Sequence, residues 1–241
     1  MKKFFFKLVR KSTDDFYKIV YEALIKSQKM FIITANPETF MIGYSNKEFN
    51  NILLSDTTTI VPDGIGIVKA ARYLGIPVEE RITGVDLTEK ILRFANDLKK
   101  TIYLYGASEE VLYAFVMYIK EKYPHITIAG YVNGYGDNDD YVVQEVKRKQ
   151  PDIILVALGV PKQEIVISKL VNNSTKGIFI GVGGTFDVLS GYKKRAPRIF
   201  IKLNLEWLYR IMAEPYRIKR FYNNNIKFIF EIRKLKQNMQ Q

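Results

Sequence analysis

Asp63 is the residue whose setting points most directly to chemistry. It lies in Val61-Pro62-Asp63-Gly64-Ile65-Gly66, after a short apolar run and before a helical pattern. A carboxylate at the end of a buried strand can project into a ligand crevice and act as a general base. The same carboxylate could instead be the N-cap of a helix that starts at Gly64. The two roles are compatible, and the sequence leaves both open.

Two further polar positions flank Asp63 along the chain. Thr34 and Asn36, in Thr34-Ala35-Asn36-Pro37, offer a hydroxyl and an amide that could hydrogen-bond a sugar or a phosphate, although Asn-Pro also favours a simple turn. Arg81, in Arg81-Ile82-Thr83-Gly84, precedes a helical pattern and could bind a phosphate together with helix N–H groups. The alternative for Arg81 is a surface ion pair with Glu79 or Glu80.

The glycine-rich loops can be compared with the motifs of the main classes of nucleotide-binding proteins. Gly106-Ala107-Ser108 follows an apolar run and opens a helical pattern, as phosphate loops do, but it lacks the full G-x-G-x-x-G of dinucleotide sites. Gly181-Val182-Gly183-Gly184-Thr185 also carries glycines, but we expect no helix at the right distance after it. The chain contains no G-x-x-x-x-G-K-[ST], which argues against a P-loop NTPase.

A candidate metal motif is present in Asp137-Asn138-Asp139, the D-x-D pattern of many sugar transferases. It stands in a polar turn before a helical pattern, where Asp and Asn are expected as turn and cap residues. We therefore favour the structural role. The single histidine, His125, cannot by itself build a histidine-rich metal site, and the absence of cysteine excludes disulfides and thiolate catalysis.

Charge is concentrated at the C-terminal end. The net charge is +12 over 241 residues, but residues 193–241 hold 13 Lys and Arg against 3 acidic residues and therefore carry +10. This imbalance predicts an anionic partner, which could be a lipid surface, a pyrophosphate or RNA. Interleaved aromatic residues favour the membrane surface. They are Trp207, Tyr209, Tyr216, Phe221, Tyr222, Phe228 and Phe230.

Membrane-spanning and export signals are not expected. The longest apolar run, Ile153 to Val160, is far shorter than the roughly 20 residues that a spanning helix needs. Met1-Lys2-Lys3-Phe4-Phe5-Phe6 resembles the start of a signal peptide, but Lys7, Arg10 and Lys11 interrupt the apolar stretch early. We therefore expect a cytoplasmic protein that is peripheral on the inner face of the membrane.

Short apolar runs alternate with helical patterns along the first 192 residues. Expected strands are Met30–Thr34, Thr59–Val61, Thr101–Tyr105, Thr127–Tyr131, Asp152–Ala157 and Gly177–Val182. Expected helices are Asp14–Ser27, Lys47–Ser55, Gly64–Leu74, Val85–Lys99, Glu109–Lys122, Asp139–Lys149 and Lys162–Val171.

This alternation predicts an α/β, Rossmann-like fold with a mostly parallel sheet of about six strands and helices on both faces. Residues 1–192 would form the catalytic domain, and residues 193–241 a basic, aromatic-rich helical appendage. Ligands of such sheets bind at the carboxyl ends of the strands. The polar and glycine-rich loops named above all fall at those ends.

Several motifs taken in order resemble the WecG/TagA/CpsF glycosyltransferases, glycosyltransferase family 26. The resemblance covers about Phe16 to Arg220 and leaves out the tail after Phe221. It is carried by Thr34-Ala35-Asn36-Pro37-Glu38, Val61-Pro62-Asp63-Gly64-Ile65-Gly66, Arg81-Ile82-Thr83-Gly84-Val85-Asp86-Leu87, Ala157-Leu158-Gly159-Val160-Pro161-Lys162-Gln163-Glu164, Gly181-Val182-Gly183-Gly184-Thr185-Phe186-Asp187, Arg195-Ala196-Pro197 and Leu205-Glu206-Trp207-Leu208-Tyr209-Arg210.

The resemblance implies an inverting, metal-independent enzyme without a cofactor. Asp63 would be the base, and Thr34, Asn36, Arg81 and Gln163 would surround the reacting groups. The UDP moiety would be held by Gly106, Ser108, Tyr135, Gly159, Gly184 and Asp187, and the acceptor diphosphate by Arg210, Arg217 and Arg220. The loop Gly134-Tyr135-Gly136-Asp137 departs from the more usual His-Gly-Tyr-Phe of the family.

The expected reaction moves a sugar, N-acetylmannosamine first among the candidates, from a UDP-sugar to an undecaprenyl-diphosphate-linked GlcNAc-type acceptor in teichoic acid or surface polysaccharide synthesis. UDP-N-acetylmannosamine uronic acid or UDP-glucose are alternative donors. More distant alternatives are a nicotinamide-dependent oxidoreductase and an RNA-binding protein. We expect no nucleic acid partner, and a homo-oligomer remains open.

Overall fold

The computed structural model describes residues 1–240, with the backbone alone for Arg217 and Arg220. Within that range the strands form one six-stranded sheet in which every neighbouring pair is parallel, in the order β2-β1-β6-β5-β3-β4. The strands are β1 (Lys29–Ala35), β2 (Thr58–Pro62), β3 (Thr101–Gly106), β4 (Thr127–Val132), β5 (Ile153–Ala157) and β6 (Gly177–Gly181). The predicted α/β fold is confirmed, and each strand lies within two residues of its expected range.

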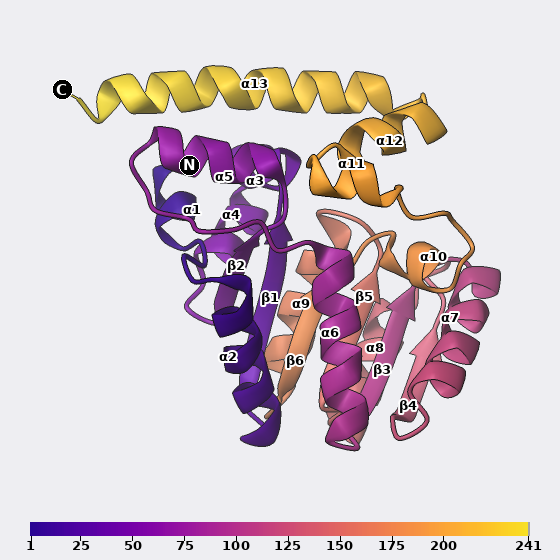
Figure 1. Ribbon diagram of the computed structural model, residues 1–241. Coiled ribbons are helices and arrows are strands. Elements are labelled where there is room, and N and C mark those ends of the chain that lie inside the picture. The colour runs from indigo at the N-terminus through magenta and orange to yellow at the C-terminus, as the bar shows by residue number, and fades with distance from the viewer. Residues whose placement is uncertain (241) are drawn as a thin grey trace.

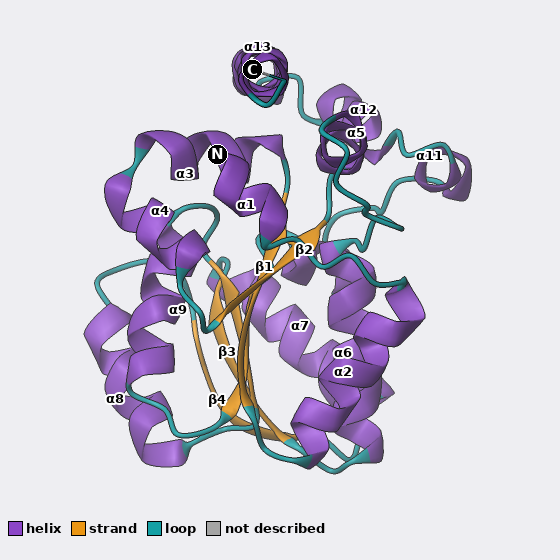
Figure 2. Ribbon diagram, turned by 90° about the vertical axis from the view of Figure 1, so that its left-hand side faces the viewer, coloured by secondary structure: helices purple, strands orange, loops and turns teal. Residues whose placement is uncertain are grey.

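Helices cover both faces of the sheet (Figure 1, Figure 2). One face carries α2 (Thr13–Ile25), α6 (Gly84–Asp97) and α7 (Glu109–Lys122). The other carries α4 (Lys47–Leu54), α8 (Asp139–Lys149) and α9 (Lys162–Asn172). The remaining helices of the first 192 residues are α1 (Lys2–Phe6), α3 (Pro37–Ser45), α5 (Ile65–Tyr73) and α10 (Thr185–Leu189).

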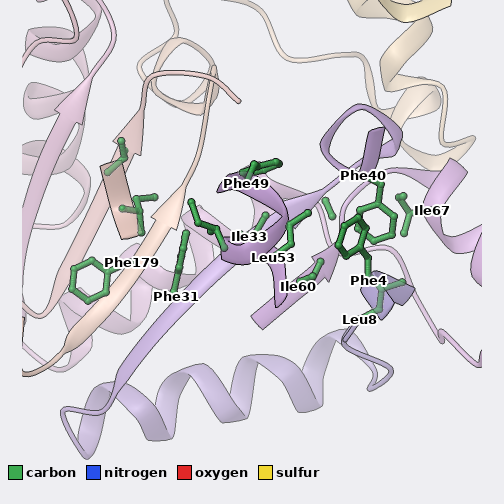
Figure 3. Packing of buried hydrophobic residues seen from close by; sticks show 14 of the residues in the cluster. Phe4, Leu8, Phe31, Ile33, Phe40, Phe49, Leu53, Ile60, Ile67 and Phe179 are labelled. Atoms are coloured by element: carbon green, nitrogen blue, oxygen red, sulfur yellow. The ribbon is translucent and has the colours of Figure 1, made fainter. Parts of the chain in front are cut away.

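The central strands β1, β3, β5 and β6 are largely apolar because both of their faces are buried, whereas the edge strand β4 is exposed or half-buried along its length. In β1, Phe31 and Ile33 belong to the cluster under α4 and α9, whereas Ile32 belongs to the cluster under α2 and α6. Figure 3 shows Phe31 and Ile33 beside Phe49 and Phe179 in the first of these clusters. Successive side chains alternate between the two cores, as strand geometry requires.

The apolar start of the chain is part of the core. Phe4 and Phe5 are fully buried, and both pack edge-on against Phe40 of α3, with ring centroids 5.4 and 5.0 Å apart. Figure 3 shows Phe4 against Phe40. The short helix α1 that presents them has no counterpart among the expected helices, because five residues are too few for a helical period.

Two further helices, α3 and α10, were not expected from the sequence. The expectation that no helix follows Gly184 is wrong, because α10 begins at Thr185 and buries Phe186 completely. Helix α3 begins at Pro37, where the sequence also suggested a turn. Both are short or lack a strong apolar period, so that local pattern alone does not reveal them.

The C-terminal appendage consists of α11 (Arg198–Lys202), α12 (Glu206–Ala213) and α13 (Arg217–Asn238). Figure 1 shows α13 lying across the top of the molecule, over α3 and α5. Phe228 and Ile232 of α13 are buried, and the Phe228 ring lies 6.4 Å from that of Phe5. None of the helices in residues 1–240 is long and apolar enough to cross a bilayer.

Candidate active site

The carboxyl ends of the strands lie in a row along one edge of the sheet, beneath α11 and α12 (Figure 1). From β3 the chain passes through α7 to β4 on one side, whereas from β5 it passes through α9 to β6 on the other. The β3–β5 boundary is therefore a topological switch point, the place where open α/β sheets bind ligands. Asp63 follows β2, four strand spacings from β3, or roughly 19 Å along the edge.

Asp63 does not cap a helix. Helix α5 has Gly64 as its N-cap and no side-chain cap hydrogen bond, so the structural role that the sequence left open for Asp63 is wrong. Instead, the backbone N–H groups of Asp63 and Gly64 both donate to the Ala35 carbonyl, at 3.0 and 3.3 Å. These bonds fix the loop against the end of β1, while the carboxylate accepts a backbone hydrogen bond from Gly84 at the start of α6.

A small cavity of about 60 Å³ opens at Asp63. The Thr34 hydroxyl and the Asp63 carboxylate lie on the same side of Gly84, since a Cβ atom built on Gly84 would be 3.5 Å from Thr34 Oγ1 and 3.7 Å from Asp63 Oδ2. Helix α12 contributes two side chains from above. The lining residues are Thr34, Asp63, Thr83, Gly84, Val85, Val182, Gly184, Thr185, Glu206 and Arg210.

The surroundings of Asp63 raise the pKa of its carboxyl group. Burial is the main cause, and the negative charge of Glu206 adds to it. Arg81, Arg210 and a backbone hydrogen bond from Gly84 act in the opposite direction and favour the ionised form. A carboxylate with raised proton affinity beside two guanidinium groups has the properties of a general base.

Asn36 has a structural role next to this cavity. It is the N-cap of α3, and its Oδ1 accepts from the Thr39 N–H at 3.0 Å, while Thr39 Oγ1 accepts from the Asn36 N–H at 3.3 Å. This reciprocal pair is a capping box. A Cβ atom on Gly64 would lie 3.2 Å from Asn36 Cβ, so the cap also supports the Asp63 loop.

Gln163 joins two strand-end loops rather than lining the cavity. Its side chain is buried, and its Oε1 accepts from the Gly159 N–H after β5 and the Gly183 N–H after β6, each at 3.1 Å. Its Nε2 donates to Glu164 Oε1 at 2.8 Å. Glu164 is 1% exposed, its Oε2 has no partner, and burial raises its pKa to about 7.

Arg81 is bound by the C-terminal appendage. Its guanidinium pairs with Glu206, and its Nη1 donates to Asn204 Oδ1 at 3.2 Å. Of the surface partners that the sequence suggested, the Glu80 carboxylate accepts from Thr13, and the backbone carbonyl of Glu79 accepts from Arg72. The alternative of a surface ion pair is therefore wrong for Arg81.

The predicted nucleotide residues are spread along the edge, and only Gly184 lines the Asp63 cavity. At the switch point the Ala107 N–H donates to the Ala157 carbonyl at 3.0 Å, and the Gly134 N–H donates to the Ala107 carbonyl at 2.8 Å. Gly106 has φ +122°, and a Cβ atom there would lie 2.4 Å from the Ala157 carbonyl oxygen, so only glycine fits.

The other nucleotide candidates have varied surroundings. Ser108 is the N-cap of α7, and Tyr135 is 72% exposed beside the switch point. Gly159 has φ +77° in the loop that Gln163 holds. Asp187 pairs with Lys193 at 3.2 Å.

In the D-x-D motif, Asp139 accepts from the Tyr105 hydroxyl at 2.5 Å and lies in the first turn of α8. This carboxylate therefore already has a protein partner. Of the predicted acceptor-binding arginines, Arg210 lines the cavity. The side chains of Arg217 and Arg220 fall outside the described part of the structure.

Sequence reasoning missed Glu206, Thr83 and Thr185. Thr83 caps α6 by accepting from the Asp86 N–H at 3.1 Å, and Thr185 Oγ1 donates to the Val182 carbonyl at 2.7 Å. A signal for Glu206 existed in the charge pattern, because it is one of only 3 acidic residues among 13 basic ones in residues 193–241. An isolated acidic residue in a basic segment suggests a specific ion pair, and Glu206 pairs with Arg81.

Comparison with known proteins identifies the family of the chain. The family model described as "Glycosyl transferase WecG/TagA/CpsF family" matches residues 4–241, which includes the tail that the motif resemblance left out.

Three proteins named N-acetylglucosaminyldiphosphoundecaprenol N-acetyl-beta-D-mannosaminyltransferase are similar to the chain. The Bacillus subtilis protein is 42% identical over 78% of this chain and 73% of its own. The Bacillus spizizenii protein is 39% identical over 82% of this chain and 76% of its own. The Staphylococcus aureus protein is 37% identical over 89% of this chain and 84% of its own. The chain therefore belongs to the WecG/TagA/CpsF family of glycosyl transferases.

Proposed function

We propose that the protein transfers N-acetylmannosamine from a UDP-sugar to N-acetylglucosamine carried on undecaprenyl diphosphate, as a step of teichoic acid or surface-polysaccharide synthesis. The relatives' names supply the sugar and the acceptor. The observation that carries the proposal is Asp63, a carboxylate with raised pKa in a cavity at the carboxyl edge of the sheet. Family membership disfavours the oxidoreductase and RNA-binding alternatives.

The proposed reaction is a single displacement with inversion. Asp63 accepts the proton of the acceptor hydroxyl as that oxygen forms a bond to the anomeric carbon, and the bond from that carbon to the UDP oxygen breaks. Positioned general-base catalysis contributes roughly 10²–10⁴-fold. Because burial raises the pKa of Asp63, activity should decline on the acid side at a pH above the ordinary range for aspartate.

The donor would lie along the carboxyl edge of the sheet. Its uridine would occupy the switch point near Gly106 and Tyr135, and its sugar would reach the β2 end where Asp63 stands. An elongated nucleotide-sugar suits this arrangement, because roughly 19 Å separate β3 from β2.

Negative charge on the departing UDP needs positive potential nearby. Arg210 lines the cavity, and the amino terminus of α6 begins there at Gly84. We propose that these groups stabilise the departing UDP without a metal ion, because Asp139 of the D-x-D motif already accepts a hydrogen bond from Tyr105. Transfer should therefore continue in the presence of EDTA.

Helix α13 suits an anionic membrane that would present the acceptor. Its inner side is anchored by Phe228 and Ile232, while its outer side exposes apolar and basic residues together. Such a mixed face is typical of interfacial helices. The exposed residues are Ile218, Lys219, Tyr222, Lys227, Ile229, Phe230, Arg233 and Lys234.

A donor panel tests the proposal. The protein is incubated with a short-chain lipid-diphosphate-GlcNAc acceptor and, separately, with UDP-N-acetylmannosamine, its uronic acid or UDP-glucose, and UDP release is measured. We expect release with UDP-N-acetylmannosamine that depends on the acceptor. Release with one of the other donors alone would replace the proposed sugar, and no release with any of them would refute the proposed reaction.

A further inference from the structure

Arg81 stands between two candidate partners, a donor phosphate and the C-terminal appendage. In the structure its side chain is 11% exposed, and both of its side-chain partners, Asn204 and Glu206, come from the appendage more than 120 residues away along the chain. We propose that Arg81 is a positioning residue that docks α12 over Asp63. This inference rests on the proposed function only for what the docked position of α12 contributes to catalysis.

The local backbone is built to present both partners to Arg81. Asn204 has φ +59°, a left-handed conformation that asparagine tolerates better than most residues, in the turn between α11 and α12. Glu206 follows two residues later in the first turn of α12, and its side chain is 9% exposed. The turn therefore points an amide and a carboxylate at one guanidinium.

Glu206 also connects Arg81 to the cavity. Its Oε1 lies 3.8 Å from Arg210 Nη2, so one buried carboxylate stands between two guanidinium groups. Arg210 lines the cavity, whereas Arg81 does not. Docking of α12 through Arg81 thus brings the positive charge of Arg210 to Asp63, and the charge of Arg81 itself is already balanced by Glu206.

The two roles for Arg81 predict opposite effects of removing Glu206. If Arg81 docks α12, Arg81→Gln and Glu206→Gln break the same interaction and have the same effect. If Arg81 binds the donor diphosphate, Glu206→Gln frees its charge and strengthens UDP binding. Removing one partner of a buried ion pair leaves the other charge without compensation, so either single change should undock the helix.

The experiment compares Arg81→Gln, Glu206→Gln and the double variant by hydrogen exchange of α12, by UDP titration and by turnover. Arg93→Gln, which removes an exposed Arg–Glu pair on α6, is the matched control. Exchange of the strand amides shows whether each variant is folded. We expect α12 amides to exchange about 100-fold faster in each single variant (~3 kcal/mol). Turnover should fall in parallel with the loss of protection, and UDP affinity should change equally in the two single variants, because both move Arg210 away from the cavity.

The double variant should lose no more than either single variant, because both changes remove one interaction. Weaker UDP binding by Arg81→Gln with α12 still protected would overturn the inference, as would tighter UDP binding by Glu206→Gln. Exchange is measured without substrate, so it decides the docking role even if the donor panel refutes the proposed reaction.

Discussion

Glu164 gives the protein a stability that depends on pH in a defined direction. Its carboxyl group is buried in the first turn of α9, accepts one hydrogen bond from Gln163 and has an unpartnered Oε2. Burial raises its pKa from 4.5 to about 7. The folded state therefore binds a proton more tightly than the unfolded chain does.

The magnitude follows from the difference between the two pKa values. Below about pH 4.5 the carboxyl group is protonated in both states and costs nothing. As the pH rises through about 7 the unfolded chain ionises first, and stability falls by about 3 kcal/mol before it levels off. Glu164→Gln removes this dependence, because a carboxamide does not ionise.

Urea unfolding of both proteins at a series of pH values measures the effect. Far-UV circular dichroism is the suitable probe, since the single tryptophan, Trp207, lies in α12 and reports on the appendage. The stability of Glu164→Gln minus that of the unsubstituted protein should rise by about 3 kcal/mol from pH 4 to pH 8. The new amide should shift the free energy of unfolding by the same amount at every pH, so the test is how the difference between the two proteins changes with pH.

The control is Glu48→Gln, on the exposed surface of α4. The free energy of unfolding of Glu48→Gln should stay within about 0.5 kcal/mol of that of the unsubstituted protein at every pH. A Glu164→Gln difference that is equally flat would refute the reasoning, because it would mean that Glu164 is ionised in the folded protein at little cost.

Two further substitutions test the loops at the carboxyl edge. A Cβ atom on Gly181 would lie 2.5 Å from Gln163 Nε2, so Gly181→Ala should displace Gln163 from the loops that it joins and lower the free energy of unfolding by about 1–3 kcal/mol. UDP binding, measured by calorimetry, should weaken. An unchanged dissociation constant would argue against a link between Gln163 and the nucleotide loops. Asn36→Ala removes the capping box of α3 and should lower stability by about 1 kcal/mol in thermal unfolding while retaining most turnover; inactivity as complete as that of an Asp63 variant would show that Asn36 contacts the substrate directly.

Much of the fold could be predicted because its central strands are buried on both faces. Runs such as Ile153 to Ala157 are uniformly apolar, and the helices between them, α7 for example, have amphipathic patterns with a recognisable cap in Ser108. The parallel sheet and the position of Asp63 at its carboxyl edge follow from that alternation. The short helices α1 and α10 escaped because a few residues carry no period.

The site was predicted less completely, because its interactions join distant parts of the chain. Nothing local in Arg81 indicates a partner 125 residues further on, and Gln163 gives no sign of accepting two backbone N–H groups from different loops. Asn36 could be identified as a turn or cap residue from its neighbour Pro37, but the reciprocal bond with Thr39 requires the helix to exist. Motifs located the loops, and packing determined which side chains face the cavity.

The role of Asp63 as the base is tested most directly by Asp63→Asn, assayed for turnover with UDP-N-acetylmannosamine and the lipid-linked acceptor and for UDP binding. The account predicts a fall in turnover of roughly 10²–10⁴-fold with an unchanged UDP dissociation constant, because the carboxylate serves proton transfer and lies at the far end of the edge from the uridine. Turnover close to that of the unsubstituted protein would contradict the account.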